Sequence, residues 1–479
     1  MDTRKSRGAG RQEPAGAGKG RGNVSIGVSG GDMLPLPMRI NAILVRSTLV
    51  GALGGLLFGF DTAVISGTTQ QLTQVFHLSP GALGLTVSIA LWGTVIGAIG
   101  AGPLGQRIGG REALRIMALL YVLSAAGCAL AWNWPSLLGF RLIGGLGIGG
   151  SSVLGPVYLA ELAPARMRGR LVGLFQINIV AGILLAYASN YGVATLIGGE
   201  TAWRWQFGVA TLPAAAFALL LFGIPRSARW LVTQKRIEAA RRVLELIGTP
   251  DTDAELKEIV SSIHLEQSAK SEPLFQRKYR LPIFLAVTIG MFNQLSGINA
   301  ILYYANDIFS FGGFSSLSGD KQAVLLGAMN FVATLLAMSV IDKLGRKSLL
   351  LIGSVGTAVA LGGVAAIFHA NSHQADLVWL LVAFIFFFSI SQGAVIWVYI
   401  SEVFPTRVRS KGQSLGSSSH WVMNAVISGF FPFVAKHSTA APFMFFSAMM
   451  ALQFVVVLLV YPETKGASLE QLQHKLGTD

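Results

Sequence analysis

The chain has 479 residues, of which 37 are Lys or Arg and 23 are Asp or Glu, so its formal charge is +14. Only 13% of the residues are charged, whereas 52% are hydrophobic and the mean hydropathy is +0.58. About 249 residues are apolar, against the roughly 240 that twelve membrane spans of about 20 residues require. This composition excludes a soluble globular protein and predicts a polytopic membrane protein. The single cysteine, Cys128, excludes a disulfide framework, a cysteine-rich zinc site and an iron–sulfur cluster.

Residues 1–40 are rich in Gly, Arg, Lys and Pro and lack the apolar stretch of a signal peptide. We expect a disordered cytoplasmic tail whose basic residues help to set the membrane orientation. Nucleic-acid binding is the other interpretation of these basic residues, but the segment has no fold around them to support it. No nucleic-acid partner is therefore expected.

Twelve apolar runs separated by short polar breaks predict twelve transmembrane helices. The runs lie near 43–70, 82–102, 112–131, 137–162, 171–195 and 206–224, and then near 281–308, 321–341, 348–369, 376–402, 412–435 and 441–461. The pattern predicts an all-α membrane protein with six-helix bundles at 41–224 and 281–461 and a tail at 462–479.

Residues 225–280, between the two sets of spans, are polar and charged. Helical character runs from Arg236 to Ile247, and Thr252 with Glu255 forms a capping box that predicts a second short helix. We expect a helical cytoplasmic linker that joins the two bundles.

Basic residues in the short loops predict the orientation of the chain. Four loops carry twelve of them: Arg107, Arg111, Arg115, Arg166, Arg168, Arg170, Lys343, Arg346, Lys347, Arg407, Arg409 and Lys411. The loops on the other face hold only Arg204, Lys321 and Lys436. Because cytoplasmic loops are enriched in Lys and Arg, the first group is predicted to face the cytoplasm. Both termini are then cytoplasmic, in a multi-pass protein of the inner membrane.

An internal repeat supports the division into two halves. Glu161, Pro164, Arg166, Arg168 and Arg170 recur with identical spacing as Glu402, Pro405, Arg407, Arg409 and Lys411, an offset of 241 residues. A second pair, RIGGR at 107–111 and KLGRK at 343–347, is offset by 236 residues. Two copies of one six-helix unit predict a transporter with its substrate site near the midplane, between the copies.

Several motifs resemble those of the sugar porter family of the major facilitator superfamily, and the likeness covers nearly everything after residue 40. The motifs are GFDTAVISG (59–67), RLIGGLGIG (141–149), PVYLAELAPARMRGRLV (156–172), NQLSGINAILYYA (293–305), DKLGRKSLLL (342–351), WVYISEVFPTRVRSKG (397–412) and YPETKGASLEQL (461–472). The chain is most similar to bacterial sugar–proton symporters of the xylose, glucose and galactose type. It departs from the family pattern at Gln106, Gly110, Arg226, Asn293 and Ala394.

Ionisable residues are rare inside the predicted spans, so Asp61 and Arg141 stand out. Counting along the helices places Asp61 about 13 Å and Arg141 about 8 Å below the outer surface, so the two side chains can pair. One interpretation is a permanent buried ion pair. The other is a carboxylate that takes up a proton when its arginine partner moves away. The family resemblance favours the second, because an acid at this position implies proton symport there.

A sugar is neutral and covered in hydroxyl groups, so its site needs amide side chains and an aromatic face. The predicted substrate-binding residues are Gln176, Asn293, Gln294, Asn299, Asn330, Trp397, His420, Trp421 and Asn424. The resemblance implies sugar contacts for all of these except Asn293, His420 and Trp421. Amides that merely join helices are the alternative. Gln294 and Asn299 lie about 140° apart around a regular helix, so they converge only if the helix bends, and Gly297 makes a bend plausible.

The paired Glu and Arg motifs lie at the cytoplasmic ends of spans. We expect Glu161, Arg168, Asp342, Arg346, Glu402 and Arg409 to form ion pairs across the two halves and to close the inner mouth. The alternative is that they are solvated charges that only set orientation. No metal site is expected, because His369 and His373 have no second ligand pair. No phosphate loop and no nucleophile–base pair is visible either, so we expect no cofactor and no enzyme activity.

The combined prediction is proton-coupled symport of a monosaccharide by alternating access, with the sugar, the proton and the lipid bilayer as partners. A monomer is expected. A facilitative uniporter that works without protons is the first alternative. A non-transporting sugar sensor is the second, although the C-terminal tail leaves little room for a signalling domain. Hexose and pentose carriers of the family share these ligands, so the pattern predicts a monosaccharide without choosing among them.

Overall fold

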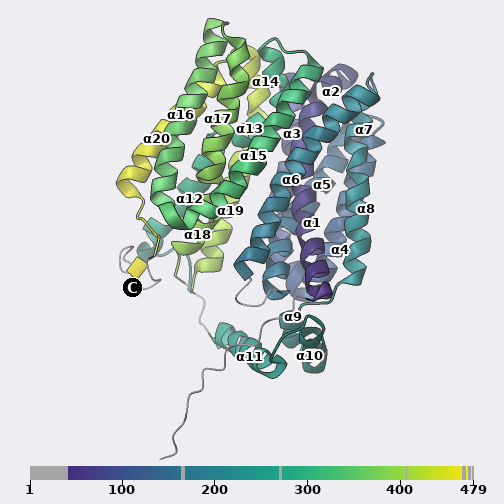
Figure 1. Cartoon of the computed structure of the whole chain (residues 1–479), viewed down its shortest axis with the longest axis vertical. Helices are drawn as coiled ribbons and strands as arrows, with labels where there is room; N and C mark the ends of the chain where they lie inside the picture. The colour runs from purple at the N-terminus through teal and green to yellow at the C-terminus, as the bar shows by residue number, and fades with distance from the viewer. Residues whose placement is uncertain are drawn as a thin grey trace, which may run out of the picture. The chain divides into compact units, whose positions relative to one another are not determined.

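The computed structural model describes residues 41–162, 168–268, 272–405, 407–466, 471–472 and 476. The described residues form helices joined by short turns, with no strand among them (Figure 1). The first bundle contains α1 (Ala42–Val64), α2 (Thr69–Phe76), α3 (Pro80–Ile108), α4 (Gly110–Ala129), α5 (Trp134–Leu162), α6 (Arg168–Leu196), α7 (Ala202–Val209) and α8 (Thr211–Leu220). The short helix η1 (Ile65–Gly67) continues α1, and η2 (Leu221–Gly223) continues α8.

The second bundle, coloured green to yellow in Figure 1, is built in the same way. It contains α12 (Arg280–Leu295), α13 (Ile298–Tyr303), α14 (Ala305–Phe311), α15 (Ser316–Leu344), α16 (Arg346–Ala370), α17 (Leu377–Ile390), α18 (Gln392–Glu402), α19 (Arg409–His437) and α20 (Ala441–Val460). The short helix η3 (Arg277–Tyr279) precedes α12, and η4 (Gln374–Asp376) precedes α17. The all-helical fold class predicted from the composition is confirmed.

Eleven helical runs of the described chain are long and apolar enough to cross a membrane, and each coincides with a predicted span. The twelfth predicted span, near 412–435, falls on α19. This helix has 29 residues, or about 43 Å at 1.5 Å per residue, which is enough to span the hydrocarbon core. It is less apolar than the others because it buries polar side chains, among them His420, Asn424 and Ser428. Its polarity therefore marks a helix that lines a site rather than one that faces lipid.

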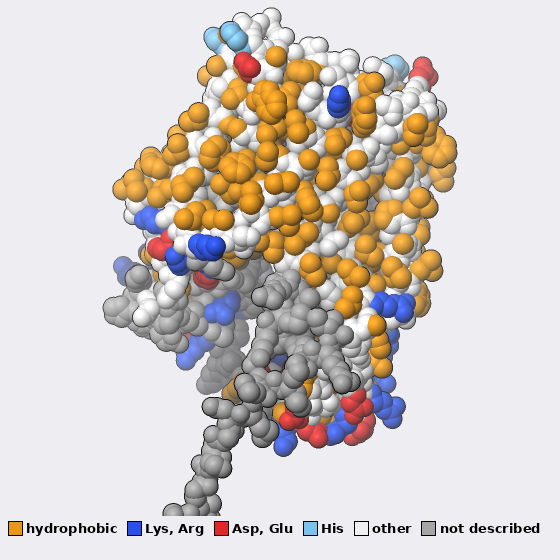
Figure 2. Space-filling model, in the orientation of Figure 1, with side chains coloured by type: hydrophobic (Ala, Val, Ile, Leu, Met, Phe, Trp, Pro, Cys, Tyr) orange, Lys and Arg blue, Asp and Glu red, His pale blue; other side chains and the backbone are white. Residues whose placement is uncertain are grey.

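Figure 2 shows hydrophobic side chains spread over the lateral surface of the bundles, whereas most of the visible Lys and Arg side chains gather at the end near the linker helices. An apolar surface of this kind has to be covered by lipid in a membrane protein. The charge distribution agrees with the predicted orientation, in which the linker and the basic loops lie on the cytoplasmic side.

The two bundles contact each other along two helix pairs, α3 with α19 and α6 with α15. Glycine permits the closest approach: a Cβ atom on Gly84 would lie 1.9 Å from the carbonyl oxygen of Gly429. The Tyr187 hydroxyl of the first bundle donates a hydrogen bond to the Leu302 carbonyl of the second at 2.7 Å. These contacts lie toward the end predicted to face outside, so the bundles are held together there.

The linker contains three helices, α9 (Ala228–Thr233), α10 (Ile237–Leu246) and α11 (Thr252–Ser268), where two were predicted. They share a small apolar core that includes Leu231 and Leu244. The predicted cap of the last helix is displaced by one residue: the Asp251 carboxylate, not the Thr252 hydroxyl, accepts a hydrogen bond from the Ala254 backbone at 2.9 Å. Aspartate is as effective a cap as threonine, and its position just before the helix decides between them.

The seventh span breaks at Gly297, as predicted from the spacing of the amides. This glycine lies between α12 and α13 and has φ of +80°, in the left-handed region. A Cβ atom here would lie 2.3 Å from the Phe446 ring. The break therefore requires glycine for two reasons, its backbone conformation and the lack of space for a side chain.

We expect Gly297→Ala to lower the free energy of unfolding by about 2 to 4 kcal/mol, because left-handed strain adds to overpacking against the Phe446 ring. Thermal unfolding in detergent measures the change. Gly192→Ala is the matched control, since a Cβ there meets nothing within 4 Å and alanine favours a helix interior. Equal unfolding temperatures for the two variants would contradict the requirement for glycine at the break.

Candidate functional site

Asp61 on α1 and Arg141 on α5 line the same small cavity, of about 10 Å³. Arg141 is only 4% exposed, and its Nε donates to the Thr86 backbone carbonyl at 2.8 Å. Its guanidinium carbon lies 5.7 Å from the centre of the Phe207 ring. The two charged side chains interact electrostatically, but no ion pair joins them among the described side chains.

This arrangement bears on the two interpretations of the Asp61–Arg141 pair. A permanent ion pair would keep the two charges in contact, whereas here Arg141 is bonded to the backbone carbonyl of Thr86 on α3. The contact with Thr86 holds the guanidinium on α3, although Arg141 still acts electrostatically on Asp61. Proton uptake by Asp61 when the arginine moves away stays a prediction.

The predicted amides of the seventh span form one hydrogen-bonded cluster with α19. The Gln294 amide donates to Asn293 Oδ1 at 3.0 Å and accepts from Asn299 Nδ2 at 3.0 Å. Gln294 Nε2 also lies 3.3 Å from both ring nitrogens of His420. The break at Gly297 is what brings Asn299 back to Gln294. The cluster provides donors and acceptors in the geometry that hydroxyl groups require.

Aromatic rings extend the amide cluster on one side. The His420 ring lies 5.1 Å from that of Trp397 and 5.0 Å from that of Trp421. Phe58 of the first bundle lies 5.6 Å from Trp421, so the aromatic group reaches both halves. Trp397 lies within the span Gln374–Glu402 and is 40% exposed, so part of its ring is free to contact a ligand. Such a ring can stack against the apolar face of a sugar.

Asn424 lies one helical turn from His420 on α19 and contacts a residue that lines the cavity of the charged pair. Its Nδ2 donates to the Tyr303 hydroxyl at 3.2 Å, and its Oδ1 accepts from Ser428 at 3.1 Å. Tyr303 and Trp421 also line the cavity that contains Asp61 and Arg141. Trp421 is therefore both a candidate sugar residue and a wall of the cavity that contains Asp61 and Arg141, and Tyr303 of that cavity bonds to Asn424. A change at one group can reach the other through direct contacts.

Two predicted substrate residues lie apart from this cluster. Asn330 on α15 accepts a hydrogen bond from the Ser389 hydroxyl at 2.9 Å, and Gln176 on α6 is half-buried. Neither makes a hydrogen bond to Gln294, Asn299 or His420 within the described part of the chain. The structure therefore joins six of the nine predicted residues through direct contacts. Asn424 lies one turn from His420 on α19, and Gln176 and Asn330 are separate in the present conformation.

Two of the predicted gate residues pair with each other within one bundle. Arg346 lies 3.1 Å from Glu402, and both belong to the second bundle. Arg409 donates to the Phe404 carbonyl at 3.3 Å, again within that bundle. Glu161 is described, but the side chains of Arg168 and Asp342 lie outside the described residues. These contacts lie within one bundle in the conformation described, and ion pairs across the halves stay a prediction.

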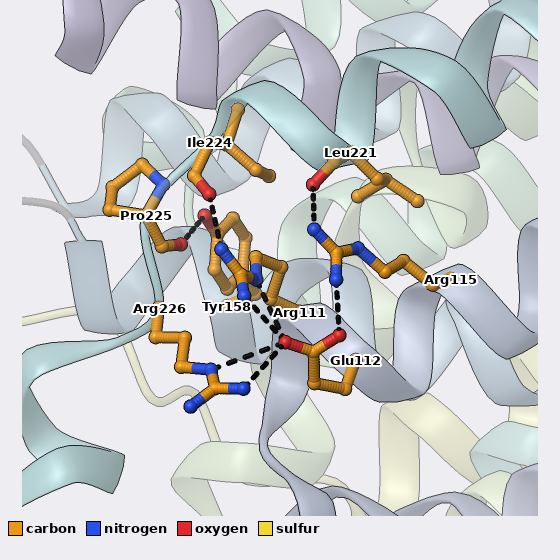
Figure 3. Close-up of polar contacts among 8 residues, drawn as sticks. All are labelled: Arg111, Glu112, Arg115, Tyr158, Leu221, Ile224, Pro225 and Arg226. Atoms are coloured by element: carbon orange, nitrogen blue, oxygen red, sulfur yellow. Dashed lines mark hydrogen bonds and ion pairs between the residues drawn. The ribbon is translucent and has the colours of Figure 1, made fainter.

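A cluster of one carboxylate and three guanidinium groups, which the sequence analysis missed, holds the linker to the first bundle (Figure 3). Glu112 forms ion pairs with Arg111, Arg115 and Arg226, the last at 3.1 Å. Arg111 also donates to the Ile224 carbonyl at 2.9 Å. Glu112 explains why a basic residue is accepted at position 226, where the family pattern has an acid.

The second bundle builds the corresponding corner with the opposite charge arrangement. Tyr158 donates to the Pro225 carbonyl at 2.7 Å in the first bundle, and Tyr399 donates to the Pro462 carbonyl at 3.2 Å in the second. After the second proline, Glu463 accepts from the Arg346 and Lys347 backbone amides, at 2.9 and 3.1 Å. Burial opposes ionisation of Glu463, but these amides lower the pKa of its carboxyl below the usual value. In the second half the acid is Glu463, which follows the last span. In the first half the acid is Glu112, which lies at the start of the third span.

We expect Glu112→Gln to destabilise the protein, because three guanidinium groups would lose their common counter-charge. Three partly exposed pairs at roughly 0.2 to 1 kcal/mol each give about 1 to 2 kcal/mol. Thermal unfolding in detergent measures this loss, and added salt should lessen the difference from the unmodified protein. Glu258→Gln, at an exposed position on α11, is the control that should leave the unfolding temperature unchanged. A neutral result for Glu112→Gln would show that the cluster contributes nothing to stability.

Two further acids, which the sequence analysis did not identify, are enclosed by protein near the predicted outer ends of spans. Asp320 on α15 accepts from Asn306 Nδ2 at 2.8 Å. Asp307 on α14 faces Thr69 and Gln70 of the first bundle, and one of its carboxylate oxygens is buried without a hydrogen bond. Within the described residues, no group of three or more His, Cys, Asp or Glu side chains could hold a metal ion.

Comparison with known proteins adds a sequence family to this geometry. The family described as sugar (and other) transporter matches residues 47–476. The chain is 34% identical to the D-xylose-proton symporter of Escherichia coli K12, over 89% of this chain and 94% of that protein. It is 35% identical to the arabinose-proton symporter of Bacillus subtilis, over 92% and 98%, and 34% identical to the glucose transport protein of Synechocystis, over 88% and 95%.

Solved structures of the E. coli xylose transporter XylE share the fold. Its inward open conformation has a TM-score of 0.81 at 32% identity and covers 90% of this chain and 99% of that one. XylE bound to 6-bromo-6-deoxy-D-glucose has a TM-score of 0.74 at 32% identity, with 91% and 100% covered. The greater likeness to the inward open form agrees with bundles that touch toward the predicted outer end.

Proposed function

We propose that this chain, which belongs to the sugar (and other) transporter family, carries a monosaccharide together with a proton across the cytoplasmic membrane by alternating access. The most similar relatives include proteins named as proton symporters of xylose and of arabinose. Their names support a pentose or hexose as the substrate class. The multi-pass membrane location follows from the family and from the apolar spans.

One observation carries the proton coupling. Asp61 and Arg141 line a cavity whose other walls include Tyr303 and Trp421, and these two residues also contact Asn424 and His420. A sugar bound at the amide cluster would therefore reposition side chains that face the carboxyl group. Coupling needs such a physical connection, because each ligand must change the preference of the protein for one conformation.

The transport cycle follows from the two conformations that the contacts allow. In the described conformation the bundles touch near Tyr187 and Leu302, and this contact supports a closed outer side. Return to the outward-facing form would separate these contacts and bring the cytoplasmic ends together. We infer that Asp61 releases its proton when Arg141 approaches it again, because a nearby cation stabilises the carboxylate.

Sugar recognition is assigned to the connected cluster, with Gln176 and Asn330 joining when the bundles close around the substrate. The assigned residues are Gln176, Asn293, Gln294, Asn299, Asn330, Trp397, His420, Trp421 and Asn424. Amide groups offer donors and acceptors to vicinal hydroxyl groups, and Trp397 offers an aromatic face. The chain would act as a monomer, with bundles at 41–224 and 281–461, the linker at 225–280, and both termini on the cytoplasmic side.

Uptake into proteoliposomes tests this function. The purified full chain is reconstituted, an inward proton gradient is imposed, and labelled xylose and glucose are supplied in separate experiments. Symport predicts accumulation above the external concentration that a protonophore abolishes. Equilibration without accumulation would support the uniporter instead, and no uptake of either sugar would contradict sugar transport and leave the sensor.

A further inference from the structure

A groove of about 490 Å³ lies beside the linker end of α12, away from the amide cluster. All of its lining residues belong to one stretch of chain, 275–288. Two arginines, Arg277 and Arg280, stand at one end of the groove. An apolar wall of Ile283, Phe284 and Val287 continues from them along the helix. The groove therefore combines positive charge with an apolar surface.

The two arginines have no acidic partner within the described part of the chain. Glu272 is the acid of this junction, and it pairs with Lys278 at 2.8 Å and with Arg407 at 2.8 Å. The hydrogen bonds from Lys278 and Arg407 lower the pKa of the Glu272 carboxyl to about 2, so it stays ionised and engaged. The positive charge of Arg277 and Arg280 is left to attract something outside the protein.

Arg280 lies at a helix end where a positive charge does not stabilise the fold. It is the first residue of α12, and the preceding residue, Tyr279, provides no side-chain cap. A cation at a helix N-terminus is disfavoured by the helix dipole. A phosphate group at this end would relieve that repulsion and would also contact both guanidinium groups.

The apolar wall distinguishes a lipid from a soluble anion. Arg280, Ile283, Phe284 and Val287 recur at the spacing of one helix face, so the wall leads from the arginines into the membrane-spanning part of α12. Phe284 is 43% exposed, and Phe275 at the mouth of the groove is 80% exposed. A small anion would use only the charged end, whereas an acyl chain would cover the aromatic and aliphatic surface.

We propose that this groove binds one phospholipid of the cytoplasmic leaflet, with an anionic headgroup on Arg277 and Arg280 and an acyl chain along Ile283, Phe284 and Val287. Basic pockets at the cytoplasmic ends of spans are suited to anionic headgroups, because the negatively charged lipids of the cytoplasmic leaflet attract Lys and Arg side chains. This inference does not depend on which substrate the protein carries.

Titration of the delipidated full chain with phosphatidylglycerol tests the proposal. Native mass spectrometry counts the lipid molecules retained, and thermal unfolding reports their effect; phosphatidylcholine serves as the zwitterionic comparison. We expect one phosphatidylglycerol to bind in preference and to raise the unfolding temperature. The double variant Arg277→Gln with Arg280→Gln should bind it on the order of thirty-fold more weakly, since each arginine contributes about fivefold at a membrane surface.

Matched variants separate the possible outcomes. Arg236→Gln with Arg242→Gln removes two exposed charges from the linker and should leave lipid binding unchanged. Phe284→Ser should weaken binding of the lipid and not of inorganic phosphate. Unaltered phosphatidylglycerol binding in the Arg277 and Arg280 variant would overturn the site. Equal stabilisation of the unmodified protein by inorganic phosphate alone would overturn the lipid as its occupant.

Discussion

Asp61→Asn is expected to abolish accumulation of sugar while exchange of sugar across the membrane continues. The amide cannot release a proton, so the step that links Arg141 movement to proton uptake disappears. A pH gradient of one unit is worth about 1.4 kcal/mol per proton and supports about tenfold accumulation. In the variant the internal concentration should only reach the external one. Proteoliposomes measure both processes: accumulation of sugar under a proton gradient, and exchange of sugar by counterflow in the absence of a gradient.

Asp320→Asn is the matched control for this prediction. Asp320 is also a buried acid in a span, but its partner is Asn306 and it does not line the cavity of Arg141. The control variant should keep its protonophore-sensitive accumulation. If the Asp61 variant still accumulates sugar, the carboxyl group does not carry the coupling. If both variants lose accumulation, the effect belongs to buried acids in general rather than to Asp61.

The spans and their division into two bundles could be predicted because about 20 apolar residues in succession have few other stable arrangements. The break at Gly297 could be predicted for a related reason, since Gln294 and Asn299 cannot meet on an unbroken helix. Local chemistry of this kind is visible in a single stretch of sequence. The break before α18 at Ser391 had no comparable signal, because no pair of residues required it.

Pairing of loop charges could not be predicted in the same way. Arg226 and Glu112 are 114 residues apart, and nothing in either segment identifies its partner. The repeat shows which charges correspond, not which of them meet in a given conformation, and in this conformation Arg346 and Glu402 meet within one bundle. A protein with two functional conformations has two sets of contacts, and one sequence encodes both. The shared cavity of Asp61 and Trp421 was invisible for the same reason: it depends on how the bundles meet.

Gln294→Ala should weaken sugar binding strongly, because this amide holds Asn299 and contacts His420 as well as offering its own groups to the substrate. Loss of two or more neutral hydrogen bonds corresponds to about 2 to 3 kcal/mol, or roughly 30-fold to 150-fold in the dissociation constant. Calorimetric titration of the detergent-solubilised protein with xylose and glucose measures it.

The control for Gln294→Ala is Gln453→Ala, which removes another buried amide of the second bundle from a position on α20. Both variants lose the same side chain from the protein interior, so a general loss of stability would affect them alike. Only the Gln294 variant should lose affinity while its unfolding temperature stays close to that of the control. Unchanged affinity in the Gln294 variant would exclude the amide cluster as the sugar site, since no other amide of the cluster contacts both Asn299 and His420 within the described residues.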